Sequence, residues 1–126
     1  MPEDRLIWSE EFSSGKGSAP NPEIWGRDLG DGTSHGIPGW GNNELQVYTA
    51  ENAFVNEDGH LELEARKITD GSAGEAYYGP VQWTSARLVT KNKLHFQYGR
   101  LVIKAMVPAG AGLWPAFWML GDTMDT

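Results

Sequence analysis

Two tryptophans, Trp114 and Trp118, lie four positions apart in the run from Gly112 to Gly121. If this run is a strand, both indoles lie on one face, because side chains alternate across a strand. Flat apolar rings on one sheet face suit stacking against the C–H surfaces of sugar rings. The spacing therefore predicts a carbohydrate-binding face, although ordinary core aromatic residues would show the same pattern.

Polar groups that could bind sugar hydroxyls occur in two other places. Trp40 lies between Gly39 and Gly41, which predicts an exposed ring on a loop, and Asn42 follows it. Arg87 lies in a β-like segment further along the chain. Carbohydrate sites combine ring faces with a few amide or guanidinium donors. These residues could form such a site, but Arg87 could equally be an ordinary surface cation.

The carboxylates give a weaker indication of catalysis. Glu62 and Glu64 lie two apart on one predicted strand face, about 6.6 Å along the backbone, which is close to the separation in a retaining glycosidase pair. Solvent-facing alternation explains both residues, and His60 beside them, equally well, and we favour that interpretation. No glycine-flanked serine of the nucleophile-elbow type occurs in the chain.

Composition limits the classes of partner. The formal net charge is −7, which argues against nucleic acid or an anionic membrane, because binding phosphates requires a concentrated basic face. There is no cysteine, so disulfides and thiolate metal sites are excluded. No apolar run is long enough for a signal peptide or a membrane span. We therefore expect a soluble chain with a neutral substrate, and if it is secreted, its leader is not present in this sequence.

The pattern of elements favours an all-β fold. The chain has 16 glycines and 7 prolines in 126 residues, and no helical caps followed by 3.6-residue apolar stripes are evident. The turn 57–59 predicts a hairpin between two of the strands, and Gly99 marks either a bulge or a close approach of backbones. Short strands with turn signals between them fit a sandwich or a barrel in one domain. The predicted strands are residues 5–12, 45–49, 53–56, 60–66, 84–90 and 96–106.

A series of short motifs follows one another in a fixed order along nearly the whole chain. They are Trp8–Phe12, Gly39–Thr49, Asn52–Val55, Asp58–Leu61, Thr84–Leu88, Tyr98–Arg100 and Trp114–Leu120. Each is weak by itself, but the ordered set strongly resembles glycoside hydrolase family 16, specifically its laminarinase-like endo-β-1,3-glucanases. The resemblance implies a concanavalin-like jelly-roll sandwich of two curved antiparallel sheets, with a glycan cleft on the concave face.

The resemblance also implies roles for individual residues. The residues expected to bind β-1,3-glucan on the glycone side are Trp40, Asn42, Arg87, Trp114 and Trp118. Many members of the family hold a structural calcium on the convex side, and Glu11 and the Gly59 carbonyl occupy matching positions. Calcium prefers oxygen ligands of these kinds. No cofactor is expected for catalysis.

The catalytic signature of the family, Glu-x-Asp-x-(x)-Glu, should follow the Trp114–Gly121 run, but the sequence ends at Thr126. In the family its first Glu is the nucleophile and its last the general acid/base, roughly 5 to 5.5 Å apart. No residue of this chain is assigned either role. We expect residues 1–126 to be the N-terminal portion of one glycoside hydrolase sandwich domain, truncated before the catalytic strand.

Half of a sandwich should expose apolar residues of its inner face and leave open sheet edges. The residues expected to be exposed are Leu61, Leu63, Leu88, Ile103 and Phe117. Such a chain could associate with itself or be complemented by another polypeptide. Three interpretations remain open: part of a secreted endo-β-1,3-glucanase that is inactive alone, a non-catalytic β-glucan-binding module, or a truncated product with no function of its own.

Overall fold

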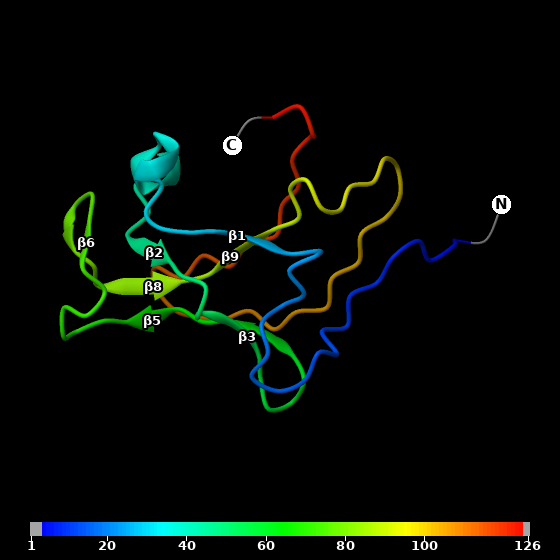
Figure 1. Ribbon diagram of the computed structural model, residues 1–126, viewed down its shortest axis with the longest axis horizontal. Helices are drawn as coiled ribbons and strands as arrows, with labels where there is room; N and C mark the ends of the chain where they lie inside the picture. The colour runs from blue at the N-terminus through cyan, green and yellow to red at the C-terminus, as the bar shows by residue number, and fades with distance from the viewer. Residues whose placement is uncertain (1–3, 125–126) are drawn as a thin grey trace.

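The computed structural model describes residues 4–124, and short β-strands dominate its regular structure (Figure 1). The nine strands are β1 (Gly26–Asp28), β2 (Gln46–Tyr48), β3 (Ala53–Val55), β4 (Leu61–Leu63), β5 (Arg66–Lys67), β6 (Glu75–Ala76), β7 (Gly79–Pro80), β8 (Trp83–Ser85) and β9 (Arg87–Val89). Two 3-10 helices, η1 (Thr33–His35) and η2 (Pro38–Gly41), lie between β1 and β2. The described part of the chain contains no α-helix, so the predicted all-β class is confirmed.

Pairing between strands is mainly antiparallel. Strand β1 pairs with β9, β3 with β4, β6 with β7, and β5 with β8. Strand β2 pairs with β8 in parallel, which departs from the purely antiparallel expectation. A parallel pair needs a long connection, and the chain between β2 and β8 contains the β3–β4 hairpin, β5 and the β6–β7 hairpin.

The β3–β4 hairpin forms where the turn signal predicts it. Val55 pairs with Leu61, and the Asn56 backbone N–H donates to the His60 carbonyl at 2.8 Å. The Asn56 side-chain oxygen accepts the backbone N–H groups of both Asp58 and His60 at 3.0 Å. Gly59 supplies the left-handed conformation of the turn, with φ 77°. Local turn chemistry therefore fixes this register.

A small core lies under β3 and β8. Ala53, Val55 and Val81 are buried, and Asn52 and Thr84 are buried polar residues among them. The Asn52 amide donates to the Glu64 carbonyl at 2.9 Å and to the Thr84 hydroxyl at 3.0 Å, and its oxygen accepts from Thr49. Because each polar atom has a partner, the network joins the strands without an unsatisfied buried group.

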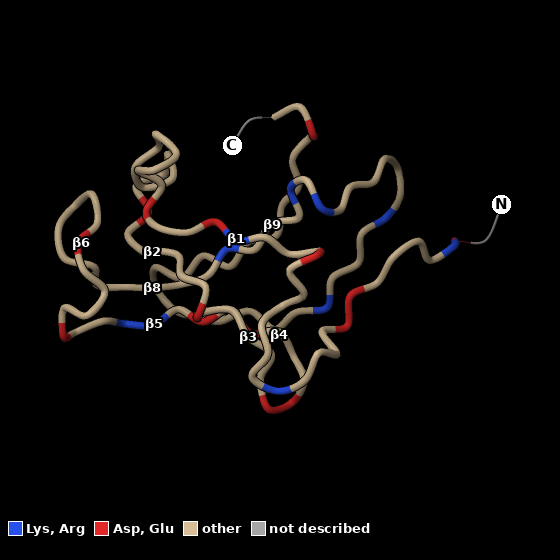
Figure 2. The backbone as a smooth tube through the Cα atoms, viewed as in Figure 1, with Lys and Arg blue, Asp and Glu red and all other residues tan. Residues whose placement is uncertain are grey.

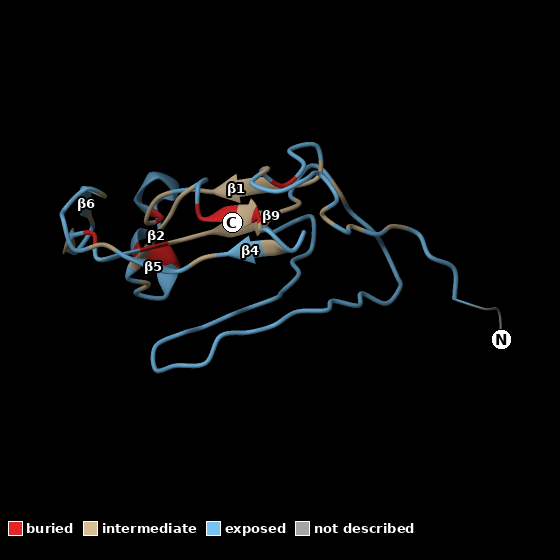
Figure 3. Ribbon diagram, turned by 90° about the horizontal axis from the view of Figure 1, so that it is seen from below, coloured by how far each residue is buried: buried red, intermediate tan, exposed pale blue. Residues whose placement is uncertain are grey.

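Two predicted strands, residues 5–12 and 96–106, do not form, and the run 112–121 that carries Trp114 and Trp118 is not a strand either. The expectation of regular structure in these segments was wrong. A strand needs a neighbour to pair its backbone N–H and C=O groups, and none of the strand pairs in the described residues includes these segments. Residues 95–124 are instead exposed and form a long excursion off one side of the strand layer (Figures 1 and 3).

Apolar exposure follows the expectation in part. Leu63, Ile103 and Phe117 are 49%, 47% and 59% exposed, whereas Leu61 and Leu88 are only half-buried.

Within residues 4–124 no helix is long and apolar enough to cross a bilayer. Lys and Arg lie at separate places along the backbone, and Asp and Glu are spread among them (Figure 2).

The Asn52 network makes a stability prediction. Asn52→Ala leaves the hydroxyls of Thr49 and Thr84 and the carbonyl of Glu64 without their partner. We expect the free energy of unfolding to fall by about 1–3 kcal/mol, the usual cost of buried unsatisfied polar groups. Urea denaturation followed by far-ultraviolet circular dichroism measures it, with Gln82→Ala, at an exposed position, as the control. Equal midpoints for the two variants would contradict the network.

Candidate functional site

Arg87 is the centre of the candidate site, and the β1–β9 pairing positions it. The antiparallel register places Arg87 opposite Asp28. The Arg87 Nε lies 3.1 Å from the Asp28 carboxylate, and the two side chains are 18% and 23% exposed. The Nε–H makes no hydrogen bond, so the contact is an ion pair held by charge and not by an aligned donor. Asp28 thus compensates a cation that is largely removed from water.

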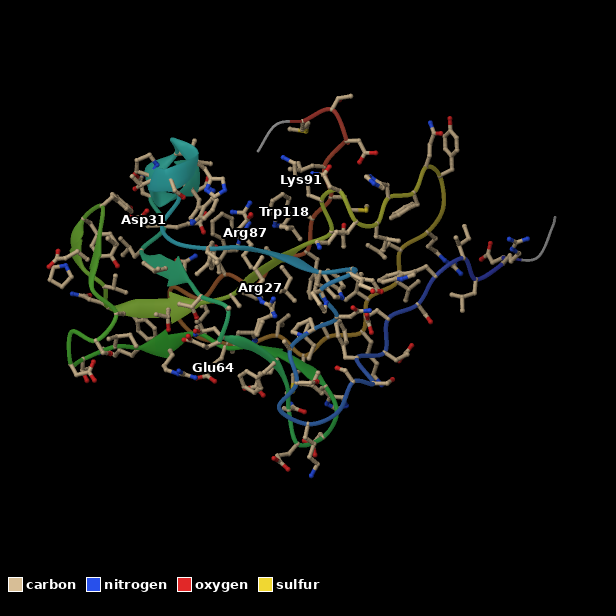
Figure 4. The ribbon with its side chains drawn as sticks, viewed as in Figure 1. Arg27, Asp31, Glu64, Arg87, Lys91 and Trp118 are labelled. Atoms are coloured by element: carbon tan, nitrogen blue, oxygen red, sulfur yellow. The ribbon has the colours of Figure 1, made fainter. Side chains whose placement is uncertain are left out.

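Aromatic rings surround the same guanidinium. Its central carbon lies 4.9 Å from the Trp40 ring centroid, 4.8 Å from that of Trp118 and 5.9 Å from that of Tyr48. Figure 4 shows Trp118 beside Arg87, although about thirty positions separate them in sequence. Cation–π contacts contribute about 0.5–1 kcal/mol when exposed and about 2 when desolvated. We call Arg87, Asp28, Trp40, Tyr48 and Trp118 the arginine cluster.

Trp40 supports the arginine cluster from inside, and the expectation of an exposed ring was wrong. The residue is 7% exposed, its indole N–H donates to the Gly30 carbonyl at 3.3 Å, and its ring lies 5.0 Å from that of His35. The flanking glycines have φ 63° and 73°, and this left-handed backbone turns the ring inward. Trp40 therefore holds Arg87 in place, and Trp118, at 52% exposed, offers the open indole.

The loop that carries Trp40 is fastened by Asp31. One oxygen of the Asp31 carboxylate accepts the Thr33 backbone N–H at 2.9 Å, and the other accepts that of Tyr77 at 2.7 Å. Hydrogen bonds from the backbone and side chain of Thr33 lower the pKa of Asp31 despite partial desolvation. The carboxylate therefore stays ionised at neutral pH and ties η1 to the β6–β7 hairpin. Its lowered pKa stabilises the fold above the ordinary value of 3.8, and this contribution is lost as the pH falls through the lowered value.

Three side chains on one face of the β2 region form a second layer beside the cluster. Glu44, Gln46 and Tyr48 are two residues apart, so they share a face. The Glu44 carboxylate accepts hydrogen bonds from Gln46 at 2.8 Å and from the Tyr48 hydroxyl. Its other oxygen accepts the Asn42 amide at 3.1 Å. Glu44 and Tyr48 were not predicted as site residues, although the two-residue spacing within the Gly39–Thr49 motif was a signal for them.

Tyr48 remains protonated throughout the neutral range. Burial, reinforced by the hydrogen bond to the Glu44 carboxylate, raises the pKa of Tyr48 to about 12. A neutral phenol donates to Glu44 and presents its ring to Trp40, with centroids 5.7 Å apart. The hydrogen bond to Glu44 thus contributes both to the protonation state of Tyr48 and to the position of its ring.

Of the other two predicted sugar-binding residues, Asn42 contacts the candidate site and Trp114 does not. Asn42 is exposed and joins the site through its amide, which donates to the Trp40 carbonyl at 3.3 Å. Trp114 is 72% exposed, and no ring or cation contact links it to the arginine cluster within residues 4–124. The alternation rule that placed Trp114 and Trp118 on one face requires a strand, and this segment is not one.

The candidate carboxylate pair serves local structure. Glu62 accepts the Asn56 amide at 3.2 Å, and Glu64 forms an ion pair with Arg66 at 2.7 Å. Figure 4 shows Glu64 well away from Arg87 and Trp118. The interpretation of these residues as solvent-facing polar groups fits their contacts better than catalysis does.

The two residues considered for calcium do not form a cage by themselves. Glu11 is exposed and lines a shallow depression made by residues 9–14 and Asn21. Gly59 is not among the residues that line it and lies in the β3–β4 turn. Within the described part of the chain, no three His, Asp or Glu side chains surround a common centre. Calcium needs six to eight oxygens, so this donor set is insufficient alone.

The largely buried Arg87 and the aromatic rings around it lie within motifs that resemble a glycoside hydrolase family. The family model "Glycosyl hydrolases family 16" matches residues 41–126. The chain is a member of that family, and the predicted resemblance is confirmed.

Individual relatives agree with the family. A beta-glucanase of Rhodothermus marinus is 46% identical over 96% of this chain. A beta-1,3-glucan-binding protein of Penaeus monodon is 44% identical over 40% of the chain. Among solved structures, the laminarinase catalytic domain of Thermotoga maritima MSB8 is 45% identical over 75% of the chain, with a TM-score of 0.61. The chain spans about a third of these longer relatives, 37% of the beta-glucanase and 35% of the laminarinase domain, and 17% of the glucan-binding protein.

Gly32 tests the packing of the Trp40 loop. A Cβ atom at Gly32 would lie 2.3 Å from the Ile37 carbonyl oxygen and 2.9 Å from the Trp40 nitrogen, in a left-handed conformation. Gly36 is also left-handed, but a Cβ there meets nothing within 4 Å. We expect Gly36→Ala to cost about 1–2 kcal/mol for the backbone alone, and Gly32→Ala to cost more and to alter the near-ultraviolet circular dichroism of the indoles. Equal unfolding free energies would mean that the loop is not packed in this way.

Proposed function

We propose that this chain is the part of an endo-β-1,3-glucanase that binds the substrate on the glycone side of the scissile bond. The observation that carries the proposal is the arginine cluster, in which the Arg87 guanidinium is fixed between Trp40 and the half-exposed Trp118. A fixed donor beside an open indole suits a neutral sugar, whose ring has an apolar face and a hydroxyl rim. The similarity to a beta-glucanase and to a laminarinase supports the same substrate class.

Each group has a distinct role in this proposal. The Trp118 indole stacks on a glucosyl ring, Arg87 donates to hydroxyls, and Asn42 supplies a further polar contact at the rim. Trp40 and Asp28 act through Arg87 by fixing its position and charge. Trp114, which lies apart from the cluster, extends the binding surface only if it moves toward Trp118 when a glucan binds.

Hydrolysis in this proposal is a double displacement that retains the anomeric configuration. One ionised carboxylate attacks the anomeric carbon, and a second carboxylic acid protonates the leaving oxygen before activating water. We assign neither role to a residue of this chain and infer that the 126-residue chain alone is inactive. A polymeric β-1,3-glucan is too large to enter a cell, so we also infer a secreted enzyme.

A non-catalytic β-glucan-binding module is the second candidate. The match to a protein named for binding β-1,3-glucan favours it, since that function needs the arginine cluster but no catalytic acids. In either case Glu11 and the Gly59 carbonyl are two candidate ligands of a structural calcium, whose remaining oxygens would come from elsewhere.

Binding of laminarin tests both candidates. We expect the 126-residue chain to bind laminarin in isothermal titration calorimetry, and Trp118→Ala to weaken binding by about tenfold, because an aromatic stacking contact contributes about 0.5–1.5 kcal/mol beyond area burial. Phe96→Ala is the matched control, because Phe96 is 53% exposed against 52% for Trp118 and lies outside the cluster. A folded chain that does not bind, or equal losses in the two variants, would refute the assignment of the site.

Stereochemistry tests the enzymatic proposal separately. The full-length gene product should hydrolyse laminarin and release the β-anomer first, because two inversions at one carbon restore the configuration. Proton NMR of the anomeric signals during the first minutes of hydrolysis shows which anomer is released first. Initial release of the α-anomer would rule out the retaining mechanism, and binding without hydrolysis would favour the second candidate.

A further inference from the structure

Glu44 joins three polar side chains of the candidate site by hydrogen bonds to its carboxylate. Its carboxylate accepts hydrogen bonds from Gln46 and Tyr48 through one oxygen and from Asn42 through the other. Its backbone is held as well, because the Glu44 N–H donates to the Gly39 carbonyl at 3.0 Å and the Tyr77 hydroxyl donates to the Glu44 carbonyl at 3.1 Å. The carboxylate is therefore fixed from both sides.

The contact between Glu44 and Asn42 sets the direction of the Asn42 amide. The amide nitrogen donates to the Glu44 carboxylate at 3.1 Å and to the Trp40 carbonyl at 3.3 Å. An ionised carboxylate and a backbone carbonyl are both acceptors only, so the nitrogen must face them. Both N–H groups are then used within the protein, and the carbonyl oxygen of Asn42 is the group available to a ligand.

The contact between Glu44 and Tyr48 acts on the arginine cluster. The Tyr48 hydroxyl donates to Glu44, and its ring packs 5.7 Å from Trp40 and 5.9 Å from the Arg87 guanidinium. Gln46 donates to the same carboxylate at 2.8 Å and to the Tyr48 oxygen at 3.0 Å, so the phenol has a fixed position. A change at Glu44 would reach Arg87 through this ring.

We propose that Glu44 is a positioning residue that aims the Asn42 carbonyl oxygen at the ligand and fixes Tyr48 against Arg87. The site then offers an acceptor from Asn42 and donors from Arg87, each held against Trp40, and a sugar hydroxyl both donates and accepts. Glu44 itself acts through these neighbours and contacts no sugar. The role of Asn42 toward a ligand rests on the proposed glucan-binding function. The contact by which Glu44 holds Tyr48 against Arg87 does not depend on that function.

Glu44→Gln removes the charge at nearly constant volume. The replacing amide has one acceptor oxygen and one NH₂ group, so it cannot accept from Asn42, Gln46 and Tyr48 as the carboxylate does. We expect laminarin to bind about tenfold more weakly, because a hydrogen bond to a charged group contributes enough for that change. Glu23→Gln, at an exposed glutamate outside the site, is the control and should bind as the original chain does.

A double-mutant cycle separates positioning from a general loss of structure. If Glu44 acts partly through Asn42, Glu44→Gln should weaken laminarin binding less in an Asn42→Ala background than in the original chain. If the two losses add in full, the coupling to Asn42 is refuted. Urea denaturation of each variant shows whether the protein is folded under the binding conditions.

Titration of Tyr48 tests the structural part without a ligand. Its pKa is raised to about 12 by burial and, next, by the hydrogen bond to Glu44. In Glu44→Gln the tyrosinate absorbance assigned to Tyr48, by difference from Tyr48→Phe, should develop at lower pH. An unchanged titration would overturn the proposal. If the original chain does not bind laminarin but the titration shifts, the proposed function fails while the positioning contact stands.

Discussion

The site depends on keeping a guanidinium in place after most of its water has been removed. Arg87 is 18% exposed, and burying a charge is unfavourable unless it is paired and solvated by other groups. Asp28 supplies the opposite charge, and the faces of Trp40, Tyr48 and Trp118 supply polarisable surface. The antiparallel register that places Asp28 opposite Arg87 is therefore an electrostatic requirement of the site as much as a feature of the fold.

That requirement explains the backbone around Trp40. The indole packs against the guanidinium, and the loop that carries it is tight: a Cβ at Gly32 would lie 2.3 Å from the Ile37 carbonyl oxygen, and one at Gly39 would lie 2.8 Å from the Tyr77 hydroxyl. Asp31 then fastens the loop to the β6–β7 hairpin through the Tyr77 N–H. Irregular segments separated in sequence are thus held in one arrangement by short polar contacts, because the described core contains few buried apolar side chains.

The elements predicted correctly from the sequence are those whose strands are joined by a short turn, so that the residues that determine them lie close together in the chain. The β3–β4 hairpin follows from the alternation around the 57–59 turn, and its register agrees. Residues 96–106 show an equally suitable strand pattern but have no pairing neighbour in the described chain, and periodicity cannot reveal a missing partner. The burial of Trp40 was mispredicted because its flanking glycines were taken to indicate exposure, whereas their left-handed backbone turns the ring inward. Of the predicted sugar-binding residues, Arg87 and Trp118 lie together. The two-residue spacing of the 39–49 motif was an overlooked signal for Tyr48, whereas no motif pointed to Asp28, which is brought to Arg87 by strand pairing.

A neutral polysaccharide offers little electrostatic attraction, so affinity for it comes from surfaces that lose little freedom on binding. An arginine in water would have to give up rotamer entropy and hydration before it could donate to a hydroxyl. In the arginine cluster the aromatic rings and Asp28 have already removed much of this entropy and hydration. The Glu44 contact restrains the Asn42 amide, although Asn42 stays exposed. If the cluster binds glucan as proposed, the residues that restrain Arg87 contribute to recognition indirectly, and the half-exposed Trp118 supplies the open surface. This division accounts for a candidate site in which the most deeply buried member of the cluster, Trp40, contacts the arginine and not the solvent.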